Sequence, residues 1–122
     1  MLTDNSSLAC IDLDDCRNSD TGAIDNWAQQ FLERAKNTYV EVSVSGCGLH
    51  VWGLSNGASK LHRNEALEIG GKQVRVELYR HTAKPLTISS QQLGKVKQLA
   101  DIDAVINWAG TFVDRHKAAA AD

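Results

Sequence analysis

The stretch that decides the fold is an alternating segment, a glycine-rich turn and a second apolar segment, which read TYVEVSVSGCGLHVWGL over residues 38–54. Residues 38–44 alternate and are rich in β-branched side chains, which is typical of a strand. Residues 49–54 are again apolar, and the serine and two glycines between the segments are typical of a tight turn. The sequence therefore predicts a β-hairpin.

A strand, an acidic segment and a helix are predicted ahead of this hairpin. Residues 8–12 are a short apolar run that ends in an acidic residue, and residues 12–25 are acidic and contain a turn signal. Apolar residues then recur at helical spacing, which predicts an amphipathic helix that begins at Asp25 or Asn26 and ends near Asn37. The apolar positions of this helix are Ile24, Trp27, Ala28, Phe31, Leu32 and Ala35.

After the hairpin, the sequence predicts a loop and two further strands. Residues 55–64 are polar and rich in Gly, Ser and Asn, which favours a loop. The glycine pair at 70–71 indicates a second turn, and residues 74–79 alternate as a strand does. Pro85 interrupts the pattern, and residues 86–88 are predicted to form a short last strand.

Two helices are predicted at the C-terminal end. The apolar residues of the first are Leu93, Val96, Leu99 and Ala100, and those of the second are Ile102, Val105, Ile106, Ala109, Phe112 and Val113. The order strand, helix, strands, helices predicts an α+β fold in which helices cover an antiparallel sheet. We expect a single domain, with residues 1–90 as the core and residues 91–122 as helices packed on it.

Composition excludes several classes of protein. The 122 residues are 43% hydrophobic and 23% charged, which is typical of a globular domain. No stretch approaches the roughly 18 apolar residues of a membrane span, and the first nine residues do not have the pattern of a secretory signal. Three cysteines are an odd number, which argues against a disulfide framework and predicts a reducing, cytoplasmic location. The net charge of −2 lowers the expectation of tight DNA binding by the chain alone.

Three acidic residues are candidate metal ligands. Asp12 and Asp14 are two positions apart, so in a strand both carboxylates point to the same face and repel each other unless a cation lies between them. Glu77 lies in an apolar strand, and if Val76 and Leu78 face the core, Glu77 faces the opposite side. Three carboxylates can hold two divalent ions such as Mg²⁺ or Mn²⁺. Taken one by one, the same residues fit a solvated acidic loop and an ordinary solvent-facing glutamate.

The turn of the hairpin is a candidate phosphate site. Gly46 and Gly48 permit positive φ and let backbone N–H groups approach an anion, Ser45 can donate a hydroxyl, and His50 can donate to a triphosphate oxygen. A glycine turn alone is more often only a tight hairpin, and a lone histidine is more often structural. The interpretation depends on their combination with the acidic strands.

In this order, the motifs resemble those of the phage and plasmid primase-polymerases in the archaeo-eukaryotic primase superfamily. The resemblance extends from about Leu8 to Ser89 and consists of an acidic pair, a serine-glycine turn followed by histidine, and an acidic residue in a strand followed by tyrosine. The matching residues are Asp12, Asp14, Ser45, Gly46, Gly48, His50, Glu77 and Tyr79. It implies an RRM-like palm sheet for the core.

The resemblance also implies a role for each matching residue. Asp12, Asp14 and Glu77 would bind catalytic Mg²⁺ or Mn²⁺. Ser45 and His50, with the glycine turn, would contact the phosphates of the incoming nucleotide. A further basic contact would come from Lys84, which matches only after a shift of one residue.

The activity implied by the resemblance is that of a DNA primase or polymerase in the replication of a phage, plasmid or mobile element. Such an enzyme transfers a nucleotidyl group from an NTP or dNTP by two-metal chemistry on a single-stranded DNA template, often beside a helicase domain or partner. No membrane is involved. Family members usually carry a further N-terminal segment, which predicts a truncated or minimal module here. The alternative is a degenerate or partial palm that binds nucleotide or single-stranded DNA without catalysis.

A zinc site is a third interpretation. Cys47 and His50 have the spacing of two zinc ligands, and Cys10 and Cys16 could be added to them. The chain lacks the paired ligand units of structural zinc sites, so we consider this interpretation the weakest.

Overall fold

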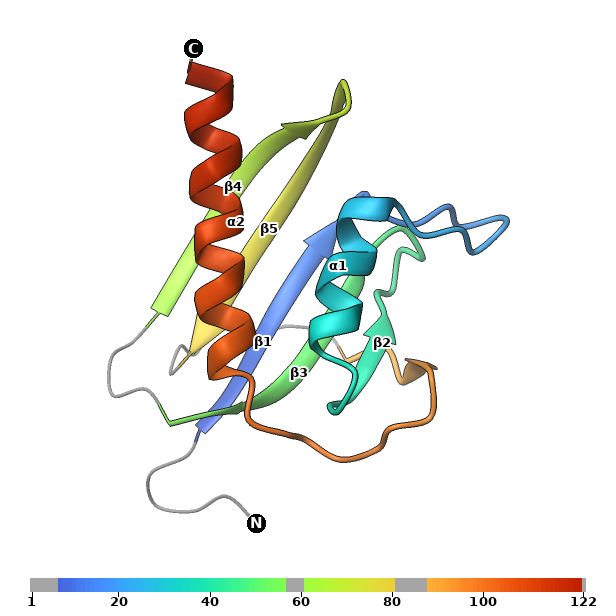
Figure 1. The fold of residues 1–122 in the computed structure, drawn as a ribbon. Helices are drawn as coiled ribbons and strands as arrows, with labels where there is room; N and C mark the ends of the chain where they lie inside the picture. Colours follow the sequence, from blue (N-terminus) through green and yellow to red (C-terminus); the bar gives the residue numbers. More distant parts are fainter. Residues whose placement is uncertain (1–6, 57–60, 81–87, 122) are drawn as a thin grey trace.

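The computed structural model describes residues 7–56, 61–80 and 88–121, with side chains to residue 117. Six antiparallel strands form one sheet in the order β4-β5-β1-β3-β2-β6 (Figure 1). The strands are β1 (Ser7–Asp14), β2 (Val40–Val42), β3 (Leu49–Ser55), β4 (Leu61–Ile69), β5 (Lys72–Arg80) and β6 (Gln91–Leu93). The helices are α1 (Asn26–Arg34) and α2 (Asp103–Ala121).

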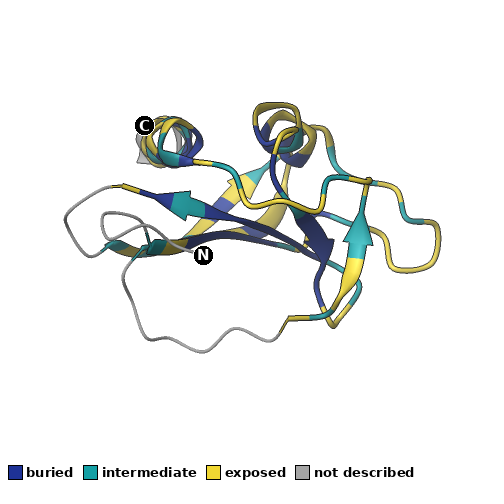
Figure 2. Ribbon diagram, turned by 90° about the horizontal axis from the view of Figure 1, so that it is seen from below, coloured by how far each residue is buried: buried dark blue, intermediate teal, exposed yellow. Residues whose placement is uncertain are grey.

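Both helices cover the same face of the sheet, which leaves the opposite face without a helical layer (Figure 2). The chain passes from β1 through α1 to β2 and returns along β3, which lies between β1 and β2. With β5 on the other side of β1, the central strands have the order β5-β1-β3-β2. The predicted α+β fold with an antiparallel sheet and a C-terminal helix is confirmed.

The main core lies between the sheet and the helices. Alternate residues of β1, Ile11 and Leu13, point into it and are fully buried. Phe31 of α1 and Phe112 of α2 meet there with their ring centroids 5.1 Å apart in an edge-to-face arrangement. Because side chains alternate along a strand, the even-numbered residues of β1 point to the face without helices.

Two elements differ from the predictions. Residues 61–69, of which the first four were predicted to be loop, form β4, an edge strand with only Leu67 fully in the core. Its remaining residues are mostly polar and alternate between half-buried and exposed, which hid the strand in the sequence. The helix predicted from Leu93 is absent: Gly94 has a φ of +83°, and residues 94–100 carry no helix.

The segment after β6 forms backbone hydrogen bonds with residues of the sheet and its flanks instead of the hydrogen bonds within a helix. Gln98 O accepts from Tyr39 N at 2.9 Å, and Ala100 O accepts from Leu54 N at 2.8 Å. The apolar spacing of this segment fits a helix, but its backbone groups pair with the edge of the sheet. The strand predicted at residues 86–88 lies mostly outside the described residues, and Ile88 itself is not in a strand.

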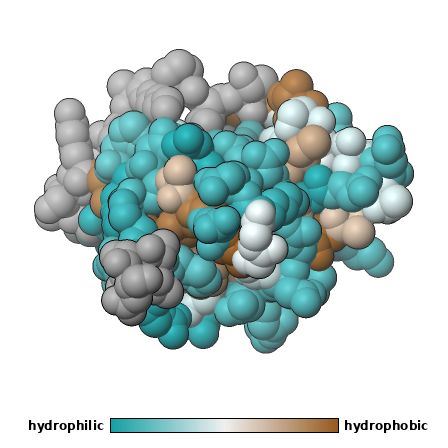
Figure 3. Space-filling model, turned by 90° about the horizontal axis from the view of Figure 1, so that it is seen from above, coloured by the Kyte–Doolittle hydropathy of each residue, from teal (hydrophilic) through white to brown (hydrophobic). Residues whose placement is uncertain are grey.

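Hydrophilic side chains cover most of the described surface that faces the viewer in Figure 3. The end of the molecule shown in Figure 3 has a polar surface in which hydrophobic side chains form only small patches. Within the described ranges, neither helix combines the length and the apolar character needed to cross a bilayer.

Candidate metal centre and nucleotide site

A row of polar residues crosses the whole sheet on the face without helices. Each member is the direct cross-strand partner of the next, so the row follows the hydrogen-bonding direction through all six strands. From β4 to β6 the row consists of Asn64, Glu77, Asp12, His50, Glu41 and Gln92. Asp12 is thereby fixed beside Glu77, which is 65 positions away in the sequence, and Glu41 beside Gln92, which is 51 positions away.

The three predicted metal ligands form the centre of this arrangement. Asp12 and Glu77 face each other across β1 and β5, and Asp14 lies two residues further along β1 on the same face. One carboxylate oxygen of each residue lies within 4.8 Å of the others. The sequence prediction that these carboxylates share one face is confirmed.

Burial makes this acidic cluster (Asp12, Asp14 and Glu77) electrostatically unusual. Asp12 and Glu77 are each 7% exposed, and Asp14 is half-buried. The pKa of Asp12 is raised to about 7, first by burial and then by the negative charges of Asp14 and Glu77, while His50 lowers it. Burial and the charge of Glu77 likewise raise the pKa of Asp14. At neutral pH the cluster therefore binds a proton readily, or a cation in its place.

A hard divalent cation fits the donor set. Asp12 Oδ1 is buried without a hydrogen-bond partner, and such an atom is costly unless a ligand or proton satisfies it. Carboxylate oxygens are the donors that Mg²⁺ and Mn²⁺ prefer. The acidic cluster therefore has the charge and donor chemistry of a divalent metal site.

His50 lies directly beside the acidic cluster. Its Nε2 is 3.6 Å from Asp12 Oδ1, and its Nδ1 is 3.0 Å from Glu41 Oε2 on the opposite side of the ring. The His50 side chain is 8% exposed, so the ring is held between two carboxylates in a nearly water-free environment. The sequence identified His50 as a candidate residue of the site, but it did not identify Glu41 as the second carboxylate beside the ring.

The glycine turn adjoins the acidic cluster through Gly48. A Cβ atom at Gly48 would lie 2.4 Å from Leu13 O and 3.3 Å from Asp14 Oδ1, so only glycine allows the turn to approach β1 this closely. Gly46 has a φ of +82°, as predicted for a glycine in this turn, whereas the φ of Gly48 is not in the left-handed region. Both glycines permit positive φ, and only Gly46 adopts it.

The turn amides are engaged within the turn itself. Gly46 N donates to Ser43 O at 2.9 Å, and Gly48 N donates to Ser43 Oγ at 3.0 Å. Cys47 N donates to Ser45 Oγ at 3.2 Å. Ser45 itself is exposed and shares a hydrogen bond with Ser43. An anion would have to replace some of these contacts to be bound by the amides.

Two further residues of the site were missed in the sequence. Glu41 was interpreted only as part of an alternating strand, although its position between the core residues Val40 and Val42 places it on the face of Asp12. His62 was assigned to a loop, but it lies on β4 with Nε2 3.5 Å from Glu77 Oε2. The strand alternation could have identified Glu41, whereas nothing local indicates His62.

A small second core continues the same open face beyond the row. It contains Cys10, Trp52 and Tyr79, all less than 10% exposed. Tyr79 donates a hydrogen bond to Glu77 and stacks on His62 with ring centroids 4.9 Å apart. Trp52 and Tyr79, the aromatic residues of this second core, are therefore buried and not presented to solvent for stacking on a base.

The cysteines do not gather into a zinc site. Cys10 lies in the second core, and Cys16 is buried in the main core on the helical side. Among the residues that the structure describes, the acidic cluster is the one group of His, Cys, Asp or Glu side chains that could hold a metal ion. Lys84, the predicted basic contact, lies outside the described residues.

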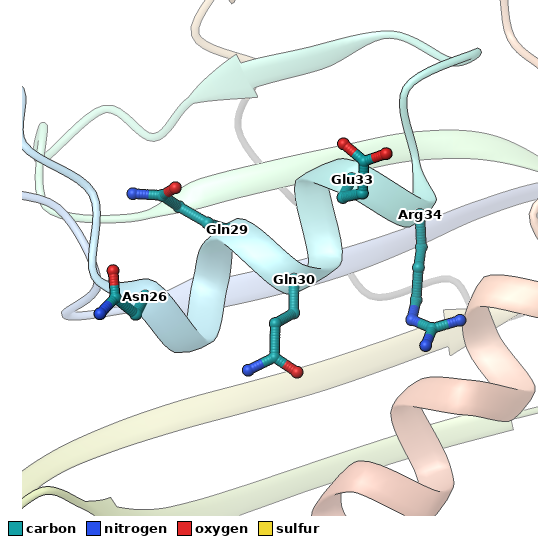
Figure 4. A pocket seen from close by; sticks show the side chains of 5 residues that line it. All are labelled: Asn26, Gln29, Gln30, Glu33 and Arg34. Atoms are coloured by element: carbon teal, nitrogen blue, oxygen red, sulfur yellow. The ribbon is translucent and has the colours of Figure 1, made fainter.

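A polar hollow on the outer side of α1 lies away from this site (Figure 4). Gln30 and Arg34 extend from one side of the helix, and Asn26, Gln29 and Glu33 extend elsewhere, so the side chains do not converge. Arg34 lies over the ring of Trp108 at 4.3 Å, which gives it a structural role. The hollow offers no chemistry comparable with the acidic cluster.

Comparison with protein-family models gives no match, and comparison with curated proteins gives no match either.

Proposed function

We propose that the chain is a metal-dependent nucleotidyltransferase of the DNA primase-polymerase type, which uses NTPs or dNTPs on a single-stranded DNA template. The observation that carries the proposal is the acidic cluster, whose three carboxylates lie within 4.8 Å of one another beside His50. The resemblance of the motifs supports the same activity. A cytoplasmic location agrees with three free cysteines.

In this proposal, the acidic cluster holds Mg²⁺ or Mn²⁺. When bound, such ions lower the pKa of a 3′-hydroxyl and stabilise negative charge on the leaving pyrophosphate. Asp12, Asp14 and Glu77 supply the negative charge that fixes the ions, and the rigid sheet behind them keeps the carboxylates in place. Removing any one carboxylate is expected to cost most of the activity.

The nucleotide is oriented by the residues on the β3 side of the acidic cluster. His50 Nε2 faces the cluster and can contact a phosphate oxygen there. Ser45 is exposed at the turn and can donate its hydroxyl, and Gly48 brings the turn close to Asp14. Lys84 is included as a basic contact on the motif resemblance alone. The template is single-stranded DNA, and a helicase domain or partner acts with the module in replication.

A degenerate palm that binds nucleotide or single-stranded DNA without catalysis is the second candidate. Two observations favour it: the turn amides already have partners within the turn, and Trp52 and Tyr79 are buried. Both reduce the contacts offered to a nucleotide or a template base. In this case the metal and the nucleotide still bind, but no phosphodiester bond forms.

Calorimetric titration of dATP in the presence of Mn²⁺ tests the site. We expect binding that requires Mn²⁺ and that is abolished in Asp12→Ala and His50→Ala. The matched control is Asp15→Asn, which removes a neighbouring but exposed carboxylate outside the acidic cluster. Absence of binding by the wild type, or equal binding by all variants, would contradict the proposed site.

A further inference from the structure

Glu41 is the most deeply buried charged residue of the described chain, and none of the motifs explains it. Its exposed fraction is 0%, although it lies in a strand of only three residues near the edge of the sheet. A buried carboxylate is costly unless hydrogen bonds and an opposite charge compensate it. The contacts of Glu41 therefore indicate what the residue is for.

Five donors converge on the two oxygens of Glu41. His50 Nδ1, Trp52 Nε1 and the amide of Ser89 lie 3.0, 3.1 and 3.2 Å from Oε2. The hydroxyl of Tyr39 and the amide of Ser90 lie 3.1 and 3.2 Å from Oε1. Burial alone would raise the pKa of Glu41, but the hydrogen bonds outweigh it and the pKa is lowered. The carboxylate is thus ionised and saturated with donors.

His50 is the only one of these five partners that also contacts the acidic cluster. A carboxylate cannot donate, so the ionised Glu41 requires that Nδ1 of His50 carry a hydrogen. The other nitrogen, Nε2, is then the one turned toward Asp12, at 3.6 Å. The direct pairing of Glu41 with His50 across β2 and β3 fixes this orientation in the backbone register.

We propose that Glu41 is a positioning residue that accepts a hydrogen bond from Nδ1–H of His50 and so fixes the ring with Nε2 toward the acidic cluster, where an Nε2–H of the protonated ring would donate to the phosphates of the nucleotide. Residues behind a ligating histidine commonly fix its tautomer and ring orientation in this way. Through Ser89 and Ser90, Glu41 also ties the two residues directly before β6 to the same ring. The nucleotide part of this inference rests on the proposed function, whereas the orientation of the ring does not.

The test uses Glu41→Gln with Tyr39→Phe as the matched control. Glutamine keeps the shape of the side chain, but one of the two acceptor oxygens is replaced by an NH₂ group. This group is itself a donor, and it would face donors that now bind a Glu41 oxygen. Tyr39→Phe removes one donor to Glu41 and leaves the contact with His50 intact. Melting curves establish that each variant is folded.

The first readout is the imidazole ¹⁵N spectrum of His50, assigned by comparison with His50→Gln. We expect a protonated Nδ1 in the wild type and in Tyr39→Phe, and a changed Nδ1 signal in Glu41→Gln. A wild-type His50 without a proton on Nδ1 would overturn the proposal, and this result needs no variant. An unchanged Nδ1 signal in folded Glu41→Gln would also overturn it.

The second readout is calorimetry with Mn²⁺ and dATP. In Glu41→Gln we expect the Kd for dATP to rise by about 10- to 100-fold, while the Kd for Mn²⁺ alone stays unchanged because the acidic cluster is intact. Equal dATP affinity in the variant and the wild type would contradict the role of Glu41 in presenting Nε2. If the wild type binds no dATP, the proposed function fails. The ¹⁵N spectrum of His50 still shows in that case whether Glu41 fixes the proton on Nδ1 and the orientation of the ring.

Discussion

Asp12 and Glu77 are direct cross-strand partners on β1 and β5, and both are almost fully buried. Like charges directly opposite each other in a sheet are destabilising. The sheet nevertheless holds them together, with Asp14 close by, in a position where a proton or a cation is needed to relieve the repulsion.

Divalent cations are expected to stabilise the folded chain. An ion that binds the acidic cluster in the folded state and not in the unfolded state raises Tm, and the rise continues with the logarithm of the ion concentration once the site is filled. Thermal melts with increasing Mn²⁺ or Mg²⁺ at pH 7.5 should show a rising Tm, which chelator reverses. Glu77→Gln should remove the response, and Glu68→Gln, an exposed glutamate on β4, should retain it. If the Tm of the wild type does not change with the concentration of either ion, the result would contradict a metal site.

The metal-free chain is expected to lose stability as the pH rises from about 4 to about 7. The pKa of Asp12 is about 7 in the folded state against 3.8 for the ordinary side chain, so in this interval the folded state keeps a proton that the unfolded state has lost. Unfolding then becomes easier with increasing pH, and the full penalty is present above pH 7. Below pH 4, Asp12 is protonated in both states and contributes no difference.

Asp12→Asn isolates this contribution. Without the buried charge, the variant should be more stable than the wild type at pH 8 by at least about 1 kcal/mol, since each unit of pKa shift corresponds to about that energy. At pH 4 the two proteins should be nearly equal. Urea denaturation in chelator at both pH values measures the difference, with Asp15→Asn as control. A variant that is less stable at pH 8 would show that Asp12 is not under electrostatic strain.

Gly48→Ala is expected to destabilise the turn and displace it from β1. The added Cβ would meet the carbonyl of Leu13 at 2.4 Å, which is too close for any side chain. Overpacking of this kind typically costs about 1–3 kcal/mol. Urea denaturation measures the loss against Gly110→Ala, whose φ, like that of Gly48, is not positive and whose Cβ would meet only Arg63 Nη1 at 3.6 Å. Equal effects of the two substitutions would show that the close approach is unimportant.

Most of the sheet could be predicted because its strands carry a local signal. The alternation in residues 74–79 places Val76 and Leu78 in the core and Glu77 on the opposite face, as the structure has it. The same alternation in β1 puts Asp12 and Asp14 on one face. These predictions depend only on the two-residue alternation of side chains along a strand, which can be recognised in the sequence itself.

The features that were missed depend on contacts between distant residues. The polar strand β4 becomes visible only through its pairing with β5 and the packing of α2 against it. The segment after Leu93 has helical spacing, but hydrogen bonds from Tyr39 and Leu54 hold it along the sheet. The burial of Glu41 likewise results from donors at positions 39, 50, 52, 89 and 90, which no local pattern brings together.

Nucleotide incorporation tests the central claim most directly. A single-stranded DNA template, with and without an annealed primer, is incubated with labelled nucleotides and Mn²⁺ or Mg²⁺, and the products are separated by size. We predict template-dependent products from the wild type and from Asp15→Asn, and none above background from Asp12→Asn, Asp14→Asn or Glu77→Gln. Absence of products from a wild-type chain that binds metal and dATP, or equal products from the carboxylate variants, would contradict the assignment of the acidic cluster as a polymerising centre.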